Sequence, residues 1–94
     1  MVTSDAVSRL KHLGVCYGSN YDCNTLDEGV AMINEEVLHS PYKEGVISTN
    51  VMYIATFCIR DKAYYRFQIV LTYGSNVLCG RTYKDSGWSS WNLL

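Results

Sequence analysis

The chain of 94 residues has little proline, little charge and no long apolar run, and each shortage excludes a class of protein. A single proline, Pro41, excludes collagen-like and proline-rich architectures. Charged residues make up only 18% and apolar residues 48% of the chain, which excludes intrinsic disorder. Charged residues 60–62 interrupt the longest apolar stretch far below the ~20 residues of a membrane span, so we expect no membrane insertion. The length fits one domain.

The beginning of the chain lacks the pattern of a secretory signal. Met1 is not followed by a basic segment and then an apolar one, so we expect no signal peptide. Charge is distributed unevenly, because the first 45 residues carry seven acids and three bases whereas the rest carry five bases and two acids. This asymmetry fits either a basic face for an anionic partner or complementary surfaces of neighbouring copies; scattered surface charge is the simplest interpretation.

The cysteines do not have the spacing of a metal or redox motif. Cys16, Cys23, Cys58 and Cys79 contain no C-x-x-C pair, which argues against a zinc ribbon or a thioredoxin-like site. Cys58 lies in an apolar run and is predicted to be buried, and Cys79 falls in a predicted strand. Cys16 and Cys23 flank a turn-rich segment where a bridge is possible, but nothing indicates an oxidising compartment, so we favour free thiols.

The N-terminal region has the pattern of a short helix over residues 5–13. Asp5 and the residues before it supply N-cap oxygens, apolar residues recur at three-to-four spacing up to Leu10 and Leu13, and Gly14 suits the position after the helix. A helix this short needs a surface to pack against. The apolar stripe fits either its own domain or the same helix in another subunit. We therefore expect a connector over 1–15 and a β domain over 16–94.

The rest of the chain predicts an antiparallel meander. Residues 17–28 are rich in turn formers, 29–33 form a short strand, and 34–45 form a polar excursion. Residues 51–59 are apolar on both sides, which predicts a strand that is either central or covered on both faces. In residues 64–72 the apolar set predicts the core face, and Arg66 and Gln68 the opposite face. That apolar set is Tyr65, Phe67, Ile69 and Leu71. Polar turns at 60–62, 73–76 and 84–87 bound the strands, and such short connections require antiparallel pairing.

No motif brings catalytic groups together. His12 and His39 lie near no recognisable nucleophile motif, and a cysteine–histidine pair is only a formal possibility. The adjacent Glu35 and Glu36 point to opposite sides of an extended segment. We therefore expect no enzyme activity, no cofactor and no metal. Residues 64–67 alternate aromatic and basic side chains as nucleic-acid platforms do, but the slightly acidic chain argues against nucleic acid.

Two tryptophans close to the C-terminus are the most distinctive local feature. Trp88 and Trp91 flank two serines, and two indoles can close one end of a small core. The alternative is that one ring faces outward as a platform on which a sugar stacks. Structural closure is the favoured interpretation.

The segment 81–94, RTYKDSGWSSWNLL, resembles the closing motif of pyocin-knob domains, with a strand, a glycine turn, W-S-x-W and a terminal leucine. Residues 21–30, YDCNTLDEGV, are similar to that family's opening segment, and the resemblance extends over about residues 20–94. The chain departs from the family at 30–32, where members often carry an aromatic residue after the glycine.

The resemblance implies a non-enzymatic component of a phage or phage-like virion, a tail-fibre or head-fibre knob that forms a homotrimer beside other virion proteins. Leu10 and Leu13 would then face a three-fold axis. Contact with host-surface polysaccharide is a further expectation, and exposed residues near turns are the candidates for it. These candidates are Tyr64, Tyr73, Asn76, Arg81 and Trp88. The alternatives are a carbohydrate-binding adhesion module and a small regulatory protein outside the virion.

Overall fold

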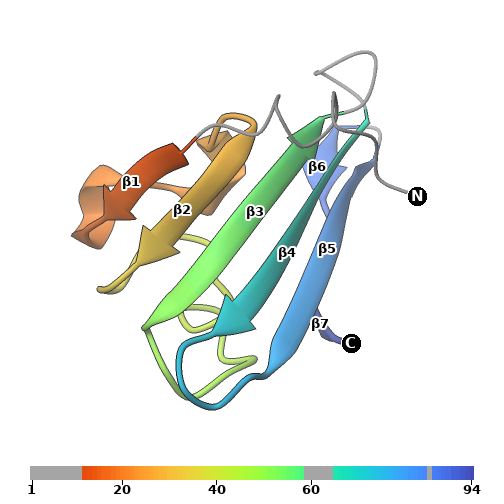
Figure 1. The fold of residues 1–94 in the computed structure, drawn as a ribbon. Helices are drawn as coiled ribbons and strands as arrows, with labels where there is room; N and C mark the ends of the chain where they lie inside the picture. The colour runs from red at the N-terminus through yellow and green to blue at the C-terminus, as the bar shows by residue number, and fades with distance from the viewer. Residues whose placement is uncertain (1–11, 59–64, 85) are drawn as a thin grey trace, which may run out of the picture.

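A single mixed β-sheet forms the framework of the protein (Figure 1). The structure, a computed structural model, describes residues 12–58, 65–84 and 86–94. Within these ranges no helix has the length and apolar character needed to cross a membrane. The strands are β1 (His12–Cys16), β2 (Gly29–Ile33), β3 (Met52–Cys58), β4 (Arg66–Thr72), β5 (Leu78–Lys84), β6 (Gly87–Trp88) and β7 (Asn92–Leu93). Two short 3-10 turns, η1 (Gly18–Asn20) and η2 (Cys23–Thr25), connect β1 to β2.

The predicted antiparallel meander is confirmed in β3, β4 and β5, and β2 joins it antiparallel to β3. The turn between β4 and β5 is tight because Gly74 and Asn76 adopt positive φ angles of 85° and 58°, which suit glycine and asparagine. The sequence pattern did not predict β1, which pairs in parallel with β2. Both β6 and β7 pair with β5, so the C-terminal segment folds back along that strand.

The helix predicted over residues 5–13 is wrong at its C-terminal end. His12 and Leu13 belong to β1, where His12 pairs with Val30 and the backbone continues through Gly14 at a φ of 85°. Pairing with β2 satisfies this backbone along a whole strand, while Leu13 packs against the core, and an isolated two-turn helix offers neither. Residues 5–11, including Leu10, lie outside the described residues. The expected boundary after residue 15 falls inside β1.

The core lies on one side of the sheet, where the segments between the strands cover it (Figure 1). We call this side the inner face and the opposite side the outer face. Cys23 and Val37 from these connecting segments are fully buried against Met52, Ile54 and Val70 of the sheet. Other core members are Cys16, Ala31, Ile33, Cys79 and Trp91. The central position of β3 is confirmed, but it is covered on one face only, because Tyr53 is 41% exposed.

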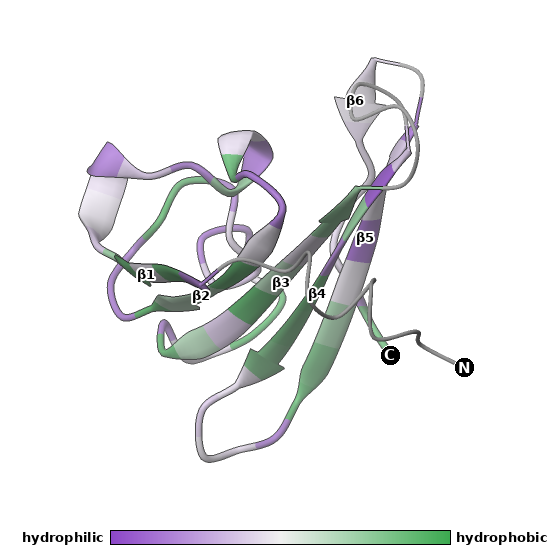
Figure 2. Cartoon of the chain, turned by 45° about the horizontal axis from the view of Figure 1, so that its top comes forward, coloured by the Kyte–Doolittle hydropathy of each residue, from purple (hydrophilic) through white to green (hydrophobic). Residues whose placement is uncertain are grey.

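The predicted core face of β4 is wrong. The buried residues of this strand are Gln68, Val70 and Thr72, while Tyr65 and Leu71 on the other side are exposed. Gln68 can face inward because its amide nitrogen donates to the Cys23 carbonyl at 2.7 Å and to the Thr56 hydroxyl at 3.1 Å. A buried amide with partners costs little, so hydrophobicity alone does not decide which face is buried. Along β4 the buried set thus contains two polar residues and one apolar residue, whereas the opposite set is apolar. Figure 2 shows how hydrophilic and hydrophobic residues alternate along the strands.

Truncation of one isoleucine on the inner face and of one leucine on the outer face tests the assignment of the two faces. Ile54→Ala removes a fully buried side chain and is expected to lower the free energy of unfolding by about 2–5 kcal/mol. Leu71→Ala, on the outer face and 37% exposed, is expected to cost less than about 1 kcal/mol. Urea denaturation at low protein concentration measures both. A larger loss for Leu71→Ala than for Ile54→Ala would contradict the assignment.

Candidate functional site

Arg81 of β5 contacts both tryptophans of the W-S-S-W segment. Its guanidinium carbon lies 4.4 Å from the ring centroid of Trp88 and 4.5 Å from that of Trp91. Arg66 extends the arrangement, 4.3 Å from the ring of Tyr83 and 5.2 Å from that of Trp88. These five residues, Arg66, Arg81, Tyr83, Trp88 and Trp91, form the aromatic–arginine cluster. Cation–π contacts of this kind gain strength when they are shielded from water, as they are around Arg81.

Strand register brings the cluster together. Gln68 pairs with Arg81 across β4 and β5, so both side chains point to the inner face. Tyr83 pairs with Trp88 of β6, and their rings meet edge to face at 5.5 Å. Between β6 and β7 the chain leaves β5, with Ser89 still bonded to the Thr82 carbonyl at 2.9 Å. This detour leaves Trp91 buried in the core, with 3% of its surface exposed.

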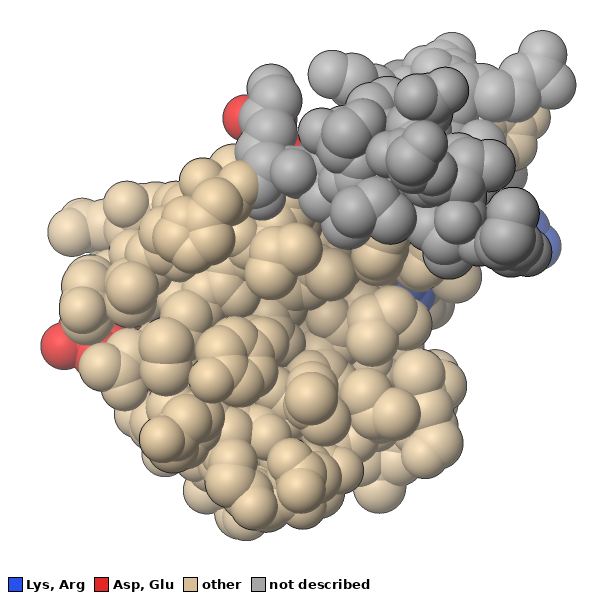
Figure 3. Space-filling view, in the orientation of Figure 1, with Lys and Arg blue, Asp and Glu red and all other residues tan. Residues whose placement is uncertain are grey.

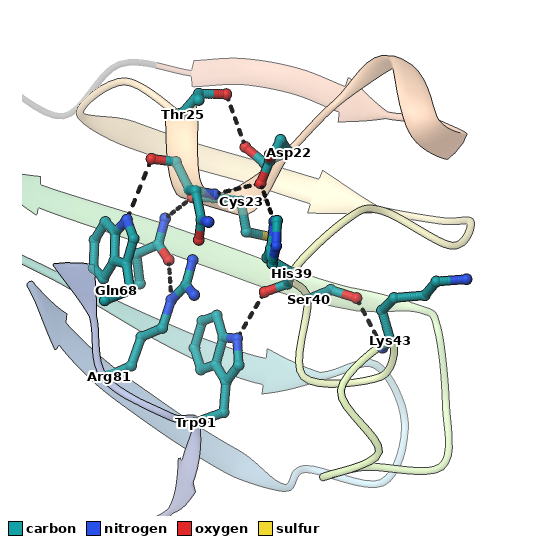
Figure 4. A network of polar contacts seen from close by, with 11 residues as sticks. Asp22, Cys23, Thr25, His39, Ser40, Lys43, Gln68, Arg81 and Trp91 are labelled. Atoms are coloured by element: carbon teal, nitrogen blue, oxygen red, sulfur yellow. Dashed lines mark hydrogen bonds and ion pairs between the residues drawn. The ribbon is translucent and has the colours of Figure 1, made fainter.

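The two indole N–H groups fasten the C-terminal segment to the loops. Trp88 Nε1 donates to the Asn24 carbonyl at 3.2 Å, and Trp91 Nε1 donates to the His39 carbonyl at 2.8 Å (Figure 4). Buried indoles need such a partner, and both find it in the loop layer over the inner face. Each tryptophan therefore acts as a tie between the end of the chain and the 22–39 region.

A buried polar network supports Arg81. Its Nε donates to the Gln68 side-chain oxygen at 2.8 Å, and Gln68 in turn donates to the Cys23 carbonyl (Figure 4). Arg81 is only 5% exposed, and burial lowers the pKa of its guanidinium to about 10, partly offset by Cys23, Glu44 and Asp22. The group still carries its charge at neutral pH. No carboxylate of the described residues forms an ion pair with it.

Three buried polar atoms in and beside the cluster have no hydrogen-bond partner among the described residues. They are the donors Arg66 Nε and Arg81 Nη2 and the acceptor Asn24 Oδ1. An unsatisfied buried polar atom costs about 1–3 kcal/mol. Arg81 and Asn24 also line a small cavity between the loops and the segment that follows Trp88.

The geometry around Cys23 argues against nucleophilic catalysis. Burial is the main cause that raises the pKa of the Cys23 thiol to about 12, so it stays protonated. His39 Nδ1 donates to Asp22 Oδ1 at 2.8 Å, but no hydrogen bond in the described part joins His39 to that thiol. Burial raises the pKa of Asp22, but hydrogen bonds from the Asn24 N–H and His39 outweigh it and make the net shift downward. The Asp22–His39 pair therefore links two loops.

The cysteines and the potential metal ligands of the described residues are dispersed. Cys16, Cys23 and Cys79 are free and buried, in agreement with the expectation of reduced thiols. Cys58 is half-buried rather than buried, which corrects the prediction for that residue. In ranges 12–58, 65–84 and 86–94, no group of three His, Cys, Asp or Glu residues has the geometry to hold a metal ion.

The candidates for surface recognition do not form one site. Tyr73 and Asn76 lie in the β4–β5 turn, at the opposite end of the sheet from β6 and Trp88 (Figure 1). Arg81 was expected to be exposed but is buried, because its guanidinium packs against the indoles. Tyr64 lies outside the described residues. Sequence reasoning missed Asn24 and Gln68, since an isolated amide gives no signal of the loop or strand it will face.

Comparison with known proteins assigns no family to the chain. No family model matches it, and no significant match was found among curated proteins or solved structures. The resemblance to pyocin-knob domains stays an expectation that rests on the two sequence motifs. The function has to be argued from the geometry of this chain.

Substituting each arginine of the cluster by lysine tests the role of Arg81. Arg81→Lys removes the Nε donor to Gln68 and the planar contact with two indoles, so we expect a loss of about 2–4 kcal/mol in unfolding free energy. Arg66→Lys, at the more exposed end of the cluster, is the matched control and should cost less than about 1 kcal/mol. Denaturation and near-ultraviolet circular dichroism measure the effects. Equal losses would contradict a special role for Arg81.

The raised pKa of the Cys23 thiol predicts that the protein loses stability at alkaline pH. Its pKa is about 12 in the folded protein, against 9.0 ordinarily, so unfolding releases a proton between these values. Stability from this group is complete below pH 9 and is lost as the pH rises toward 12. Between pH 9 and 11, the free energy of unfolding of the wild-type protein should fall by about 1 kcal/mol per pH unit more than that of the Cys23→Ala variant. The midpoints of urea denaturation are measured across this pH range for both proteins. If the two plots of midpoint against pH are parallel, the prediction is contradicted.

Proposed function

We propose that this protein is a non-enzymatic structural knob of a phage or phage-like fibre, and that it works by associating with copies of itself. The observation that carries the proposal is the apolar, uncharged outer face of the sheet. Figure 3 views the molecule from this side: uncharged residues cover most of the visible surface, and charged atoms show only near its edges and beside the grey residues.

Aromatic and aliphatic side chains of three neighbouring strands make up the outer face. Phe57 and Phe67 pair across β3 and β4 and stack with centroids 4.7 Å apart. Tyr53 and Tyr73 meet at 6.2 Å. The further members are Ala55, Ile69, Leu71 and Leu78. Monomeric proteins rarely leave a contiguous apolar surface of this kind in water.

A second copy of the chain is the occupant that best fits this face. Around a three-fold axis the outer faces of the copies pack against one another, and each Leu, Ile or Phe side chain that is buried gains about 1.5–3 kcal/mol. Among the described residues the outer face shows little charge, which offers little to a highly charged partner. A hollow of about 510 Å³ along β4 and β5 is lined by the apolar Phe67, Ile69 and Leu94 and also by Arg66 and Arg81, and it gives a neighbour's side chains a place to insert. Symmetric self-association is the commonest way to bury such a surface.

Nucleic acid is disfavoured as a partner by the direction of Arg66. Residues 64–67 alternate aromatic and basic types, but Arg66 turns to the inner side and packs over Tyr83 and Trp88. Among the described residues, Arg66 is therefore held against two rings and is not free to neutralise a phosphate. The protonated Cys23 thiol and the linking Asp22–His39 pair support a role without catalysis.

The virion assignment rests on the two motifs that resemble pyocin-knob domains, residues 21–30 and 81–94. In this proposal the knob is a homotrimer of a tail or head fibre, and the outer faces form the contacts between its copies. Leu13, which was expected to supply a trimer contact, packs against the core of its own chain, so the proposal assigns the contact to the sheet. Leu10 lies outside the described residues.

A pair of leucine substitutions tests self-association. Leu71 on the outer face and Leu38 in the loop layer are almost equally exposed, at 37% and 38%. Leu71→Glu places a charge in the proposed contact and is expected to weaken association at least tenfold, because a buried unpaired carboxylate is costly. Leu38→Glu is the matched control and should leave association unchanged. Sedimentation equilibrium over a range of protein concentrations gives the mass of each variant.

Three outcomes of that experiment would count against the proposal. One is a monomeric wild-type protein at all concentrations. Another is equal weakening by both substitutions, and a third is association that survives Leu71→Glu. Purified particles from the source provide a separate test of location, since a fibre component sediments with the particles and a regulatory protein stays in the soluble fraction.

A further inference from the structure

We infer that neighbouring copies of the chain meet head to tail, around an axis parallel to the strands. The side of the sheet at β1 and β2 in one copy lies against the side at β5 in the next. This arrangement rests on the proposed function, in which copies associate through their outer faces, and it adds which parts of those faces meet. The partner is a second copy because the chain carries the two complementary halves of the contact itself.

Opposite charges gather in different parts of the described chain. Residues 12–58 carry six acids and one base, whereas 65–84 and 86–94 carry three bases and no acid. The acids are Asp22, Asp27, Glu28, Glu35, Glu36 and Glu44, and the bases are Lys43, Arg66, Arg81 and Lys84. In Figure 3, acidic atoms show toward the β1–β2 side and basic atoms toward the β5 side. Two such sides attract each other between copies, whereas each repels its own kind.

The register of the strands places one exposed acid and one exposed base at the same end of the sheet. A row of paired residues runs across four strands from Gly29 of β2 to Arg81 of β5. Asp27 precedes Gly29 and Lys84 follows Arg81, and because β2 and β5 run in opposite directions, both lie beyond this row at one end. No ion pair among the described residues includes Asp27 or Lys84. Three strand spacings of about 4.8 Å hold them about 14 Å apart within one chain, too far to pair.

This placement selects the direction of the symmetry axis. Rotation about an axis parallel to the strands keeps every residue at its own height, so Asp27 of one copy comes level with Lys84 of the next. An axis across the strands turns the second sheet end over end and sets the acidic side of one copy against the acidic side of the other. Like charges in contact are unfavourable, so the axis parallel to the strands is preferred.

The same axis brings apolar side chains of β2 to the hollow along β4 and β5. The other three residues of β2 are buried, so Val30 and Met32 point to the outer face. Val30 lies in one row with Ile69 and Gly80, which line the hollow of about 510 Å³. Val30 and Met32 of one copy therefore come level with the hollow of the next. The flexible methionine suits an irregular gap, and the charged pair lies at the rim of this apolar contact.

Reversal of the two charges in the full chain tests the pairing. Asp27→Lys and Lys84→Asp each place like charges in every contact and should weaken association at least about threefold, since ion pairs at a rim have modest energies. The double variant exchanges the charges and should associate within about twofold of the wild type. Glu35→Lys is the matched control, because it makes the same change in charge at the other end of β2. It should leave association unchanged, and it should not restore Lys84→Asp. Sedimentation equilibrium at low ionic strength, where charges are least screened, measures each variant.

An equimolar mixture of Asp27→Lys and Lys84→Asp distinguishes a ring of three from a two-fold pair. Every contact between unlike variants joins opposite charges, so a two-fold pair of unlike chains is restored completely. A ring of three always keeps one contact between like variants. We therefore expect the mixture to associate more strongly than either variant alone, but at least about threefold more weakly than the double variant.

Three results would overturn the head-to-tail contact. They are a double variant that associates no better than the single ones, a restoration of Lys84→Asp by Glu35→Lys equal to that by Asp27→Lys, and a mixture that matches the double variant. In each case a trimer that Leu71→Glu weakens leaves the proposed function standing. A wild-type protein that stays monomeric removes both.

Discussion

The structure depends on one buried positive charge, the guanidinium of Arg81, and on the groups that make its burial possible. Water can no longer solvate this charge, so the rings of Trp88 and Trp91 and the oxygen of Gln68 replace it. The partners come from β4, β5 and the C-terminal segment, and the indoles continue the connection to the loops at Asn24 and His39. The charge therefore organises both the end of the sheet and the layer that covers it.

This arrangement explains why polar residues of β4 and β5 face inward beside the apolar core. If Arg81 faces the interior, register places Gln68 beside it, and Gln68 then satisfies the Cys23 carbonyl and the Thr56 hydroxyl. Strict alternation along β4 sends Phe67, Ile69 and Leu71 to the other side. The apolar outer side of β4 is thus a geometric consequence of the inward direction of Gln68, and it belongs to the surface that we propose to bring copies of the chain together.

Much of the secondary structure could be predicted from local patterns. The strand at residues 29–33, the meander and the turn at 73–76 follow from β-branched residues bounded by glycine and polar residues, and these signals act over a few positions. The N-terminal helix could not be judged in this way, because Leu13 takes its conformation from β2, a partner more than ten residues away. For the candidate site, the tryptophan pair was visible in the sequence, but Asn24 and Gln68 were not. Their importance comes from what they face.

By itself, the sequence determined the β-rich class, the order of the meander strands and the segments that would turn, because each depends on the properties of neighbouring residues. The tertiary structure alone decided which side of β4 is buried, why Arg81 lies inside, and which loop atoms meet it. Alternation divides a strand into two faces but does not say which one the rest of the chain will cover. That choice belongs to distant groups, here the Cys23 carbonyl and two indoles, which supply the hydrogen bonds and ring contacts that make a polar interior stable.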